Sequence, residues 1–141
     1  NKKINEDFPE WSVDKISSKT GIYERHISGK NEFTSDMAVT VCEKLFAEHN
    51  ISPNEIDFVL LCTQSPDYFL PTTACLVQNR LNIPTTAGAL DFNLGCSGYI
   101  YGLAVAKGLI FANIAKNILL ITSETYTKFI HPKIQHNEYR H

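Results

Sequence analysis

Several features that would place the chain in a specialised class of protein are missing. No apolar run approaches the roughly 20 residues of a membrane span, and the first residues, NKKINEDFPEW, lack the apolar core of a signal peptide. Basic residues do not cluster with aromatic ones, and 13 basic against 15 acidic residues give a net charge of −2. The sequence therefore predicts a cytoplasmic protein with neither a nucleic-acid nor a membrane partner.

Cysteine is scarce and widely spaced. The chain has no CxxC pair and no histidine at metal-ligand spacing, which argues against a zinc site. In a reducing compartment the cysteines are expected to be free thiols. Three of them stand inside apolar segments, where cysteine acts as a small hydrophobe, and the fourth stands at the boundary of a predicted element. In chain order they are Cys42, Cys62, Cys75 and, at the boundary, Cys96.

What is present indicates one α/β domain. The 141 residues are 43% hydrophobic and 20% charged, which is ordinary for a globular protein with a sizeable core. After a polar surface segment over residues 1–33, with a short helix expected from Val13 to Lys19, helical periodicity alternates with short apolar runs. The predicted helices are Thr34 to about His49, Thr72 to Leu81 and about Cys96 to Ala112; the predicted strands are 56–62, Ala87–Phe92 and Asn117–Ser123.

The order of these elements predicts a parallel sheet. The run IDFVLLC at 56–62 suits a strand that is covered on both faces, and short connections between strands and helices favour right-handed crossovers. Sites in such sheets form where the carboxyl ends of the strands lead into loops. We therefore expect residues 63–65, 93–96 and 123–125 to meet at one edge of the sheet.

Cys96 is the strongest chemical candidate at that edge. In Leu94–Gly95–Cys96–Ser97–Gly98 it stands between a strand and a helix, where helix N–H groups favour a thiolate. The flanking glycines leave room for a substrate carbonyl, and the Cys96 N–H can face a developing oxyanion. The residues alone leave open a second interpretation, a buried cysteine that packs a tight turn.

Other polar residues have weaker cases. His26 in TGIYERHI is a candidate general base, although a histidine beside an arginine is more often solvated or structural. Glu124 is either a hydrogen-bonded structural carboxylate, which we favour, or a polar group close to the site. A cysteine nucleophile in acyl transfer usually needs a histidine within reach, and the sequence offers none at a strand end near Cys96.

Three motifs give the chain a family resemblance. TGIYERHI at Thr20–Ile27, PTTACLVQNRLNI at Pro71–Ile83 and DFNLGCSGYIYGLAVA at Asp91–Ala106 resemble, in order and spacing, the N-terminal half of 3-oxoacyl-acyl-carrier-protein synthase III. These condensing enzymes of fatty-acid synthesis have a thiolase-like fold, built from two similar α/β halves. The resemblance covers roughly residues 1–132 and implies that this chain is one incomplete half, ending in an atypical tail at 133–141.

The resemblance also implies a reaction and its partners. Cys96 matches the cysteine that accepts an acyl group from acyl-CoA and is then attacked by the carbanion of decarboxylating malonyl-acyl carrier protein. Lys19 and Thr20 match an arginine–threonine pair near the CoA entrance, and Leu70 matches a residue that crosses a homodimer interface. No metal or redox cofactor is implied. The family's catalytic histidine and asparagine belong to its C-terminal half, which is expected to lie outside these 141 residues.

Two expectations follow if the chain is an incomplete half of the family's fold. Asn1 aligns just after the family's first strand, so we expect a gap between strands in the sheet, and we expect the 141 residues alone not to condense malonyl-acyl carrier protein. Two alternatives to a synthase III remain. One is a related acyltransferase of secondary metabolism or of the hydroxymethylglutaryl-CoA type, and the other is a non-catalytic subunit that pairs with an active condensing enzyme.

Overall fold

The computed structural model describes residues 1–129, so the predicted atypical tail at 133–141 lies outside the described residues. The chain divides into two compact units. The larger unit comprises residues 29–126, and the smaller one combines residues 1–28 with 127–129 of the described chain. No helix within residues 1–129 is both long enough and apolar enough to cross a membrane.

A three-stranded parallel sheet forms the centre of the larger unit. The strand order is β2-β1-β3, with β1 at Phe58–Cys62, β2 at Gly88–Phe92 and β3 at Ile118–Thr122. Strand β1 pairs along its whole length with both neighbours, as expected for its continuous apolar run. The predicted gap between strands is therefore wrong for these three strands, because β1 bonds directly to β2 on one side and to β3 on the other.

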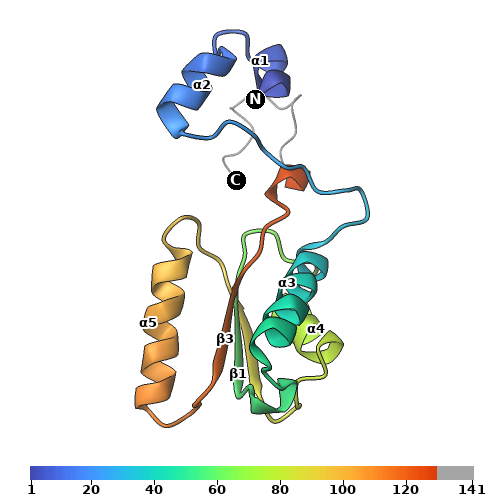
Figure 1. The fold of residues 1–141 in the computed structure, drawn as a ribbon, viewed down its shortest axis with the longest axis vertical. Coiled ribbons are helices and arrows are strands. Elements are labelled where there is room, and N and C mark those ends of the chain that lie inside the picture. Colours follow the sequence, from blue (N-terminus) through green and yellow to red (C-terminus); the bar gives the residue numbers. More distant parts are fainter. Residues whose placement is uncertain (130–141) are drawn as a thin grey trace. The chain divides into compact units, whose positions relative to one another are not determined.

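Helices cover both faces of this sheet (Figure 1). Helices α3 (Thr34–His49) and α4 (Thr73–Arg80) lie together on one face, and α5 (Gly98–Phe111) lies on the other. A short 3₁₀ turn, η1 (Pro53–Glu55), precedes β1. The layered α/β architecture predicted from the sequence is confirmed, with strand ends within two residues of the expected ones.

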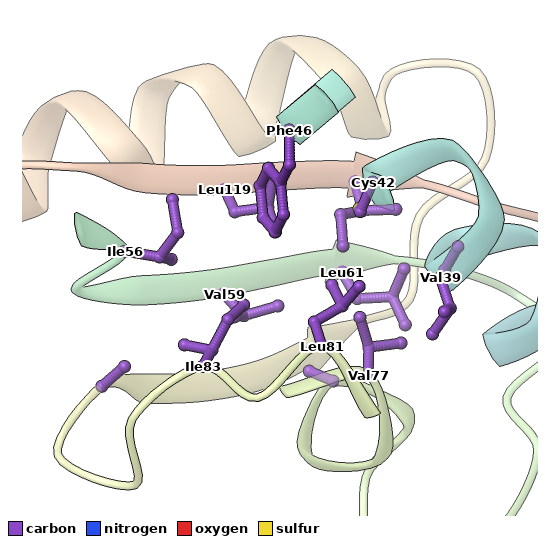
Figure 2. Close-up of a cluster of buried hydrophobic side chains, with 14 residues drawn as sticks. Val39, Cys42, Phe46, Ile56, Val59, Leu61, Val77, Leu81, Ile83 and Leu119 are labelled. Carbon is purple, nitrogen blue, oxygen red and sulfur yellow. The ribbon is translucent and has the colours of Figure 1, made fainter. Parts of the chain in front are cut away.

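The main core lies between the sheet and the helices α3 and α4 (Figure 2). Val59 and Leu61 of β1 are fully buried against Val77 of α4 and the other residues of this cluster. Successive side chains on a strand point to opposite faces, so Leu60 and Cys62 point toward α5 instead. All four residues from Val59 to Cys62 are buried, which shows that β1 is covered on both sides.

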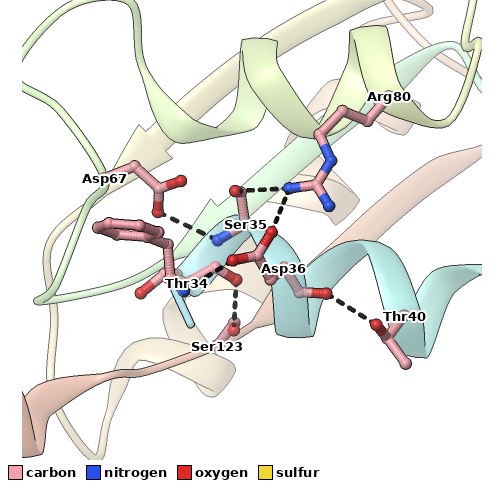
Figure 3. A network of polar contacts seen from close by, with 8 residues as sticks. Thr34, Ser35, Asp36, Thr40, Asp67, Arg80 and Ser123 are labelled. Carbon is pink, nitrogen blue, oxygen red and sulfur yellow. Dashed lines mark hydrogen bonds and ion pairs between the residues drawn. The ribbon is translucent and has the colours of Figure 1, made fainter. Parts of the chain in front are cut away.

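The polar ends of α3 and α4 are tied together (Figure 3). Arg80, at the end of α4, donates to the Ser35 hydroxyl at 2.9 Å and pairs with Asp36 at 2.8 Å. The Ser35 N–H donates to Asp67 at 3.1 Å. From β2, Asp91 accepts hydrogen bonds from the first two N–H groups of α4, at 2.7 and 2.6 Å. These contacts fix the two helices to each other and α4 to the sheet.

Two short helices make up most of the smaller unit. Helix α2 (Val13–Thr20) confirms the helix expected from Val13 to Lys19, and the Ser12 hydroxyl caps it by accepting from the Lys15 N–H. Helix α1 (Lys2–Asp7) was not predicted, because its six residues carry no clear apolar period. A 3₁₀ turn, η2 (Tyr126–Phe129), closes the described chain.

Candidate functional site

The three predicted loops do meet at the carboxyl edge of the sheet, and Glu124 joins two of them. Its carboxylate, directly after β3, accepts hydrogen bonds from the Gln64 N–H at 2.7 Å and the Ser65 hydroxyl at 2.6 Å. The Thr63 hydroxyl also donates to it at 3.4 Å. Glu124 is therefore the hydrogen-bonded structural carboxylate that the sequence favoured.

A buried group of hydroxyls holds the same loops from within. The Thr34 hydroxyl donates to the Ser65 carbonyl oxygen at 2.6 Å and shares a hydrogen bond of 3.0 Å with the Thr125 hydroxyl. The Thr125 N–H donates to the Ser65 hydroxyl at 2.8 Å, and the Ser123 hydroxyl donates to the Thr34 carbonyl oxygen at 3.0 Å. These contacts tie the start of α3 to the loops after β1 and β3.

Cys96 lies in the turn between β2 and α5. The turn is closed by the Gly98 N–H, which donates to the Gly95 carbonyl oxygen at 2.8 Å, and α5 begins at Gly98. The helix was predicted to begin at about Cys96; it begins two residues later because this turn comes first. Cys96 is exposed, whereas Cys42 and Cys62 are buried and Cys75 is half-buried. Exposure at this position contradicts the interpretation of Cys96 as a buried packing cysteine.

The backbone at Cys96 leaves one donor open to a ligand. Within the described residues the Cys96 N–H donates to no acceptor. An exposed thiol and an open N–H on one residue allow attack on a carbonyl carbon and a hydrogen bond to the oxygen that becomes negative. The described chain holds no cluster of three or more His, Cys, Asp or Glu side chains that could bind a metal ion.

Cys62 supports this turn from the sheet side. Its thiol donates to the Leu94 carbonyl oxygen at 3.3 Å, and it lies so close to Gly98 that a Cβ there would come within 2.2 Å of Sγ. Burial raises the pKa of Cys62, and the charge of Glu124 adds to this rise, so the thiol stays protonated. The sequence predicted no role for Cys62 beyond packing. Its place at the last position of β1, beside the loop that carries Cys96, was the available signal.

Gln64, in the loop after β1, lies near the turn that carries Cys96. Its side-chain Oε1 lies 3.4 Å from the position that a Cβ on Gly95 would occupy. The sequence predicted Gln64 at this edge of the sheet but not beside the turn. Nothing in the linear sequence shows this proximity, because 31 positions of the numbering separate the two residues and only the β1–β2 register brings them together.

The other predicted site residues lie in different parts of the chain. Lys19 and Thr20 are exposed at the end of α2, in the smaller unit, where the Thr20 hydroxyl donates to the Ile16 carbonyl oxygen at 2.7 Å. Leu70 belongs to the larger unit with Cys96 and is 83% exposed. Their predicted substrate and interface roles stay predictions.

His26 belongs to a cavity within the smaller unit. The cavity has a volume of about 700 Å³, and Asn1, Asp7, Arg25 and His26 are among the residues that line it. Asn1 accepts a hydrogen bond from Arg25 and donates to the Ile22 carbonyl oxygen at 2.8 Å. The contacts in this cavity do not include Cys96, so they give no support to His26 as its general base.

The chain is similar to known proteins of one family. The model of the family described as 3-oxoacyl-[acyl-carrier-protein (ACP)] synthase III matches residues 90–139, which include Cys96. A beta-ketoacyl-[acyl-carrier-protein] synthase III of Caldanaerobacter subterraneus subsp. tengcongensis is 37% identical over 131 residues, or 93% of this chain. The resemblance to the synthase III family is confirmed.

Solved structures of synthase III extend the similarity to the fold. A crystal structure of a 3-oxoacyl-(acyl-carrier-protein) synthase III is 52% identical over 91% of this chain, with a TM-score of 0.83. The synthase III of Aquifex aeolicus VF5 is 35% identical over 88% of the chain, with a TM-score of 0.78. The chain thus has a thiolase-like α/β fold. It spans only 38% of the Caldanaerobacter enzyme's length and 38% and 40% of the two solved chains.

Proposed function

We propose that this chain is the acyl-accepting part of a condensing enzyme of the 3-oxoacyl-acyl-carrier-protein synthase III type. The observation that carries the proposal is the exposed thiol of Cys96 in the turn between β2 and α5. The same residues make up part of the segment that matches the synthase III family. A structural cysteine in this turn would have no need of solvent access.

The proposed first step is a thioester exchange. The Cys96 thiolate attacks the carbonyl carbon of an acyl-CoA, and the open Cys96 N–H stabilises the oxygen that becomes negative. When the intermediate collapses, the carbon–sulfur bond to CoA breaks, CoA leaves as its thiolate, and the acyl group remains on Cys96. The step is a displacement at carbon without electron transfer, so we propose that it needs no metal or redox cofactor.

The proposed second step uses malonyl-acyl carrier protein. Loss of CO₂ from its malonyl group leaves a carbanion, which attacks the acyl carbon on Cys96 and forms a carbon–carbon bond while the Cys96 thiolate departs. The groups that promote decarboxylation are expected in the part of the complete protein outside these residues. We accordingly keep the prediction that the 141 residues alone do not catalyse the condensation.

The proposed partners follow from this chemistry. They are acyl-CoA, acyl carrier protein and a second copy of the complete protein. Leu70 supports the homodimer, because it is exposed together with its apolar neighbours Tyr68 and Phe69 in one loop of the larger unit. Lys19 and Thr20 are proposed to contact the CoA end of the substrate. We also propose a cytoplasmic location, where the free thiols would remain reduced.

The test is acylation of the complete protein by an acyl-CoA, followed by intact-mass and peptide mass spectrometry. We expect one acyl group on Cys96, loss of the adduct in Cys96→Ala, and its retention in the matched control Cys75→Ala, since Cys75 is the other incompletely buried thiol. A complete, folded protein that forms no adduct would contradict the proposal and favour the non-catalytic subunit. Transfer of the acyl group to an acceptor other than malonyl-acyl carrier protein would favour a related acyltransferase.

A further inference from the structure

We propose that Cys62 is a positioning residue for Cys96. Its buried thiol contacts the turn between β2 and α5 at both ends, residues 94 and 98, and Cys96 is the middle residue of that turn. This inference rests on the proposed function of Cys96. It gives a role to a buried thiol that the acyl transfer itself does not use.

The sheet holds Cys62 in place. Cys62 is the last residue of the central strand β1, where it pairs with Phe92 of β2 and Thr122 of β3. Its carbonyl oxygen accepts from the Ser123 N–H at 3.3 Å. The next N–H, on Thr63, donates to the Phe92 carbonyl oxygen at 3.1 Å. The Cys62 side chain therefore projects from a backbone that is bonded on both sides.

The Cys62 thiol is hydrogen-bonded to the start of the turn. It donates to the Leu94 carbonyl oxygen at 3.3 Å, and no backbone N–H of residues 1–129 donates to that oxygen. Burial raises the pKa of Cys62, so the thiol keeps the proton that it donates. Leu94 stands two residues before Cys96. The hydrogen bond therefore fixes the chain where it enters the turn.

The same sulfur touches the end of the turn. Cys62 Sγ lies 2.2 Å from the ideal position of a Cβ on Gly98. Because a carbon–carbon bond is about 1.5 Å long, Sγ is at most about 3.7 Å from the Gly98 α-carbon itself, which is van der Waals contact. Gly98 is buried, and its N–H closes the turn by donating to the Gly95 carbonyl oxygen at 2.8 Å. The sulfur thus meets the turn two residues before Cys96 and two residues after it.

Loss of this sulfur would release both ends of the turn at once. The Leu94 carbonyl oxygen would lose its donor, and space would open beside Gly98. Cys96 is exposed and would stay accessible, but its thiol and N–H would no longer hold one position relative to an acyl carbonyl. The expected effect is therefore on the rate of acyl transfer and not on the access of small reagents to the thiol.

Single-turnover acylation of Cys96 in the complete protein tests this inference, with the acyl-CoA that acylates the wild type. Misplacement of a reacting group by about 1 Å can slow a reaction by up to about a hundredfold, and we expect Cys62→Ala to slow acylation at saturating acyl-CoA by about tenfold. The acyl-CoA concentration that gives half the maximal rate should not change, because Cys62 is buried behind the turn. Alkylation of Cys96 by iodoacetamide, followed by peptide mass spectrometry, should keep the wild-type rate.

Two further variants separate positioning from loss of core packing. Cys62→Ser differs from Cys62→Ala by one hydroxyl, which can donate to the Leu94 carbonyl oxygen, and should restore most of the rate. The matched control Cys42→Ala removes the other buried thiol, which belongs to α3 on the opposite face of the sheet, and should be acylated like the wild type. If Cys62→Ala does not fold, Cys62→Val, which fills the site without a donor, takes its place and should be equally slow.

Each contrary result has a distinct meaning. Acylation of Cys62→Ala at the wild-type rate, or equal slowing in Cys42→Ala, would overturn the positioning role and leave the proposed function intact. Slow acylation of Cys62→Ser would overturn the hydrogen bond to Leu94 as its means. Equal slowing of alkylation and acylation would also overturn positioning, because it would show a general loss of thiol reactivity. A folded wild type that is not acylated would overturn the proposed function and this inference with it.

Discussion

At the scale of single residues, Asp57 shows how one carboxylate can order a sheet. It stands just before β1 and accepts hydrogen bonds from the N–H groups of Lys116 and Asn117, at 2.8 and 2.9 Å, just before β3. The hydrogen bond from Asn117 has the largest effect and the one from Lys116 the next largest. Together they lower the pKa of Asp57 below its ordinary value of 3.8. Asp57 therefore fixes the beginning of the β1–β3 pair, at the edge opposite Cys96.

This shift gives a prediction about pH. A carboxylate whose pKa is lower in the folded protein stabilises the fold above its unfolded pKa, and this contribution disappears as the pH falls through the folded pKa. Asp57→Asn should therefore unfold at a lower urea concentration than the wild type at pH 7, and the difference should shrink as the pH falls below 3.8. Urea unfolding, monitored by circular dichroism at several pH values, measures the difference in midpoint between the two proteins. An equal difference between the two proteins at all pH values would contradict it.

At the carboxyl edge of the sheet, the sequence predicted those residue positions that follow from the order of the strands. Glu124 comes directly after a predicted strand, so its nearness to residues 63–65 follows from parallel pairing. The proximity of the Gln64 side chain to Gly95 depends on its rotamer and on the shapes of two loops, which no periodicity in the sequence encodes. The motifs identified Cys96 as the candidate, but they said nothing about what holds its turn in place.

At the scale of elements, the glycines of α5 have different tasks. A Cβ on Gly98 would come within 2.2 Å of the Cys62 thiol, and one on Gly102 within 2.6 Å of Leu120. Around Gly108 no atom of residues 1–129 lies within 4 Å of that position. Two glycines therefore let α5 approach the sheet closely, whereas the third only lowers the helix propensity of the element.

The contrast predicts opposite effects of one substitution. Gly98→Ala forces extra volume between α5 and β1 and should destabilise the complete protein by about 1–3 kcal/mol. Gly108→Ala adds helix propensity without a clash and should stabilise it by up to about 1 kcal/mol. Chemical denaturation of the two variants beside the wild type gives both values. If Gly98→Ala had the same free energy of unfolding as the wild type, the Cys62 contact would not constrain the turn.

Element positions were predictable where two signals agreed. The predicted helix from Thr34 to His49 has the observed ends of α3, because capping residues and an apolar period coincide there. Helix α5 carries apolar residues throughout, so the hydrophobic periodicity did not show where the helix begins. Because the turn through Cys96 comes first, α5 begins two residues after its predicted start.

At the scale of the whole molecule, the outer surface of α5 is unusual. Apolar side chains are exposed along its length, among them Tyr99, Ile100, Leu103, Val105 and Phe111. A helix that is apolar on all sides is typical of a buried position. An exposed patch of this kind on a chain produced alone favours association.

We therefore predict that the 141-residue chain, produced alone, binds an apolar fluorescent dye and self-associates as its concentration rises. Replacing Ile100 and Leu103 by lysine should lower both dye fluorescence and light scattering. Replacing Thr40 and Ala47 of α3, two exposed neutral residues, by lysine is the matched control, because it adds the same two positive charges outside the α5 patch. A chain that stays monomeric without dye binding would contradict the prediction.

The register of the sheet has a consequence for synthesis. Residue 58 pairs with residues 88 and 118, so the partners of β1 follow it by 30 and 60 residues. At a translation rate of about 5–20 residues per second, β1 waits about 3–12 s after its own synthesis for its second neighbour. Glu124, whose carboxylate bonds to the loop after β1, comes later still. During these seconds the buried strand β1 has an open edge, and this interval is when a chaperone would protect the nascent chain best.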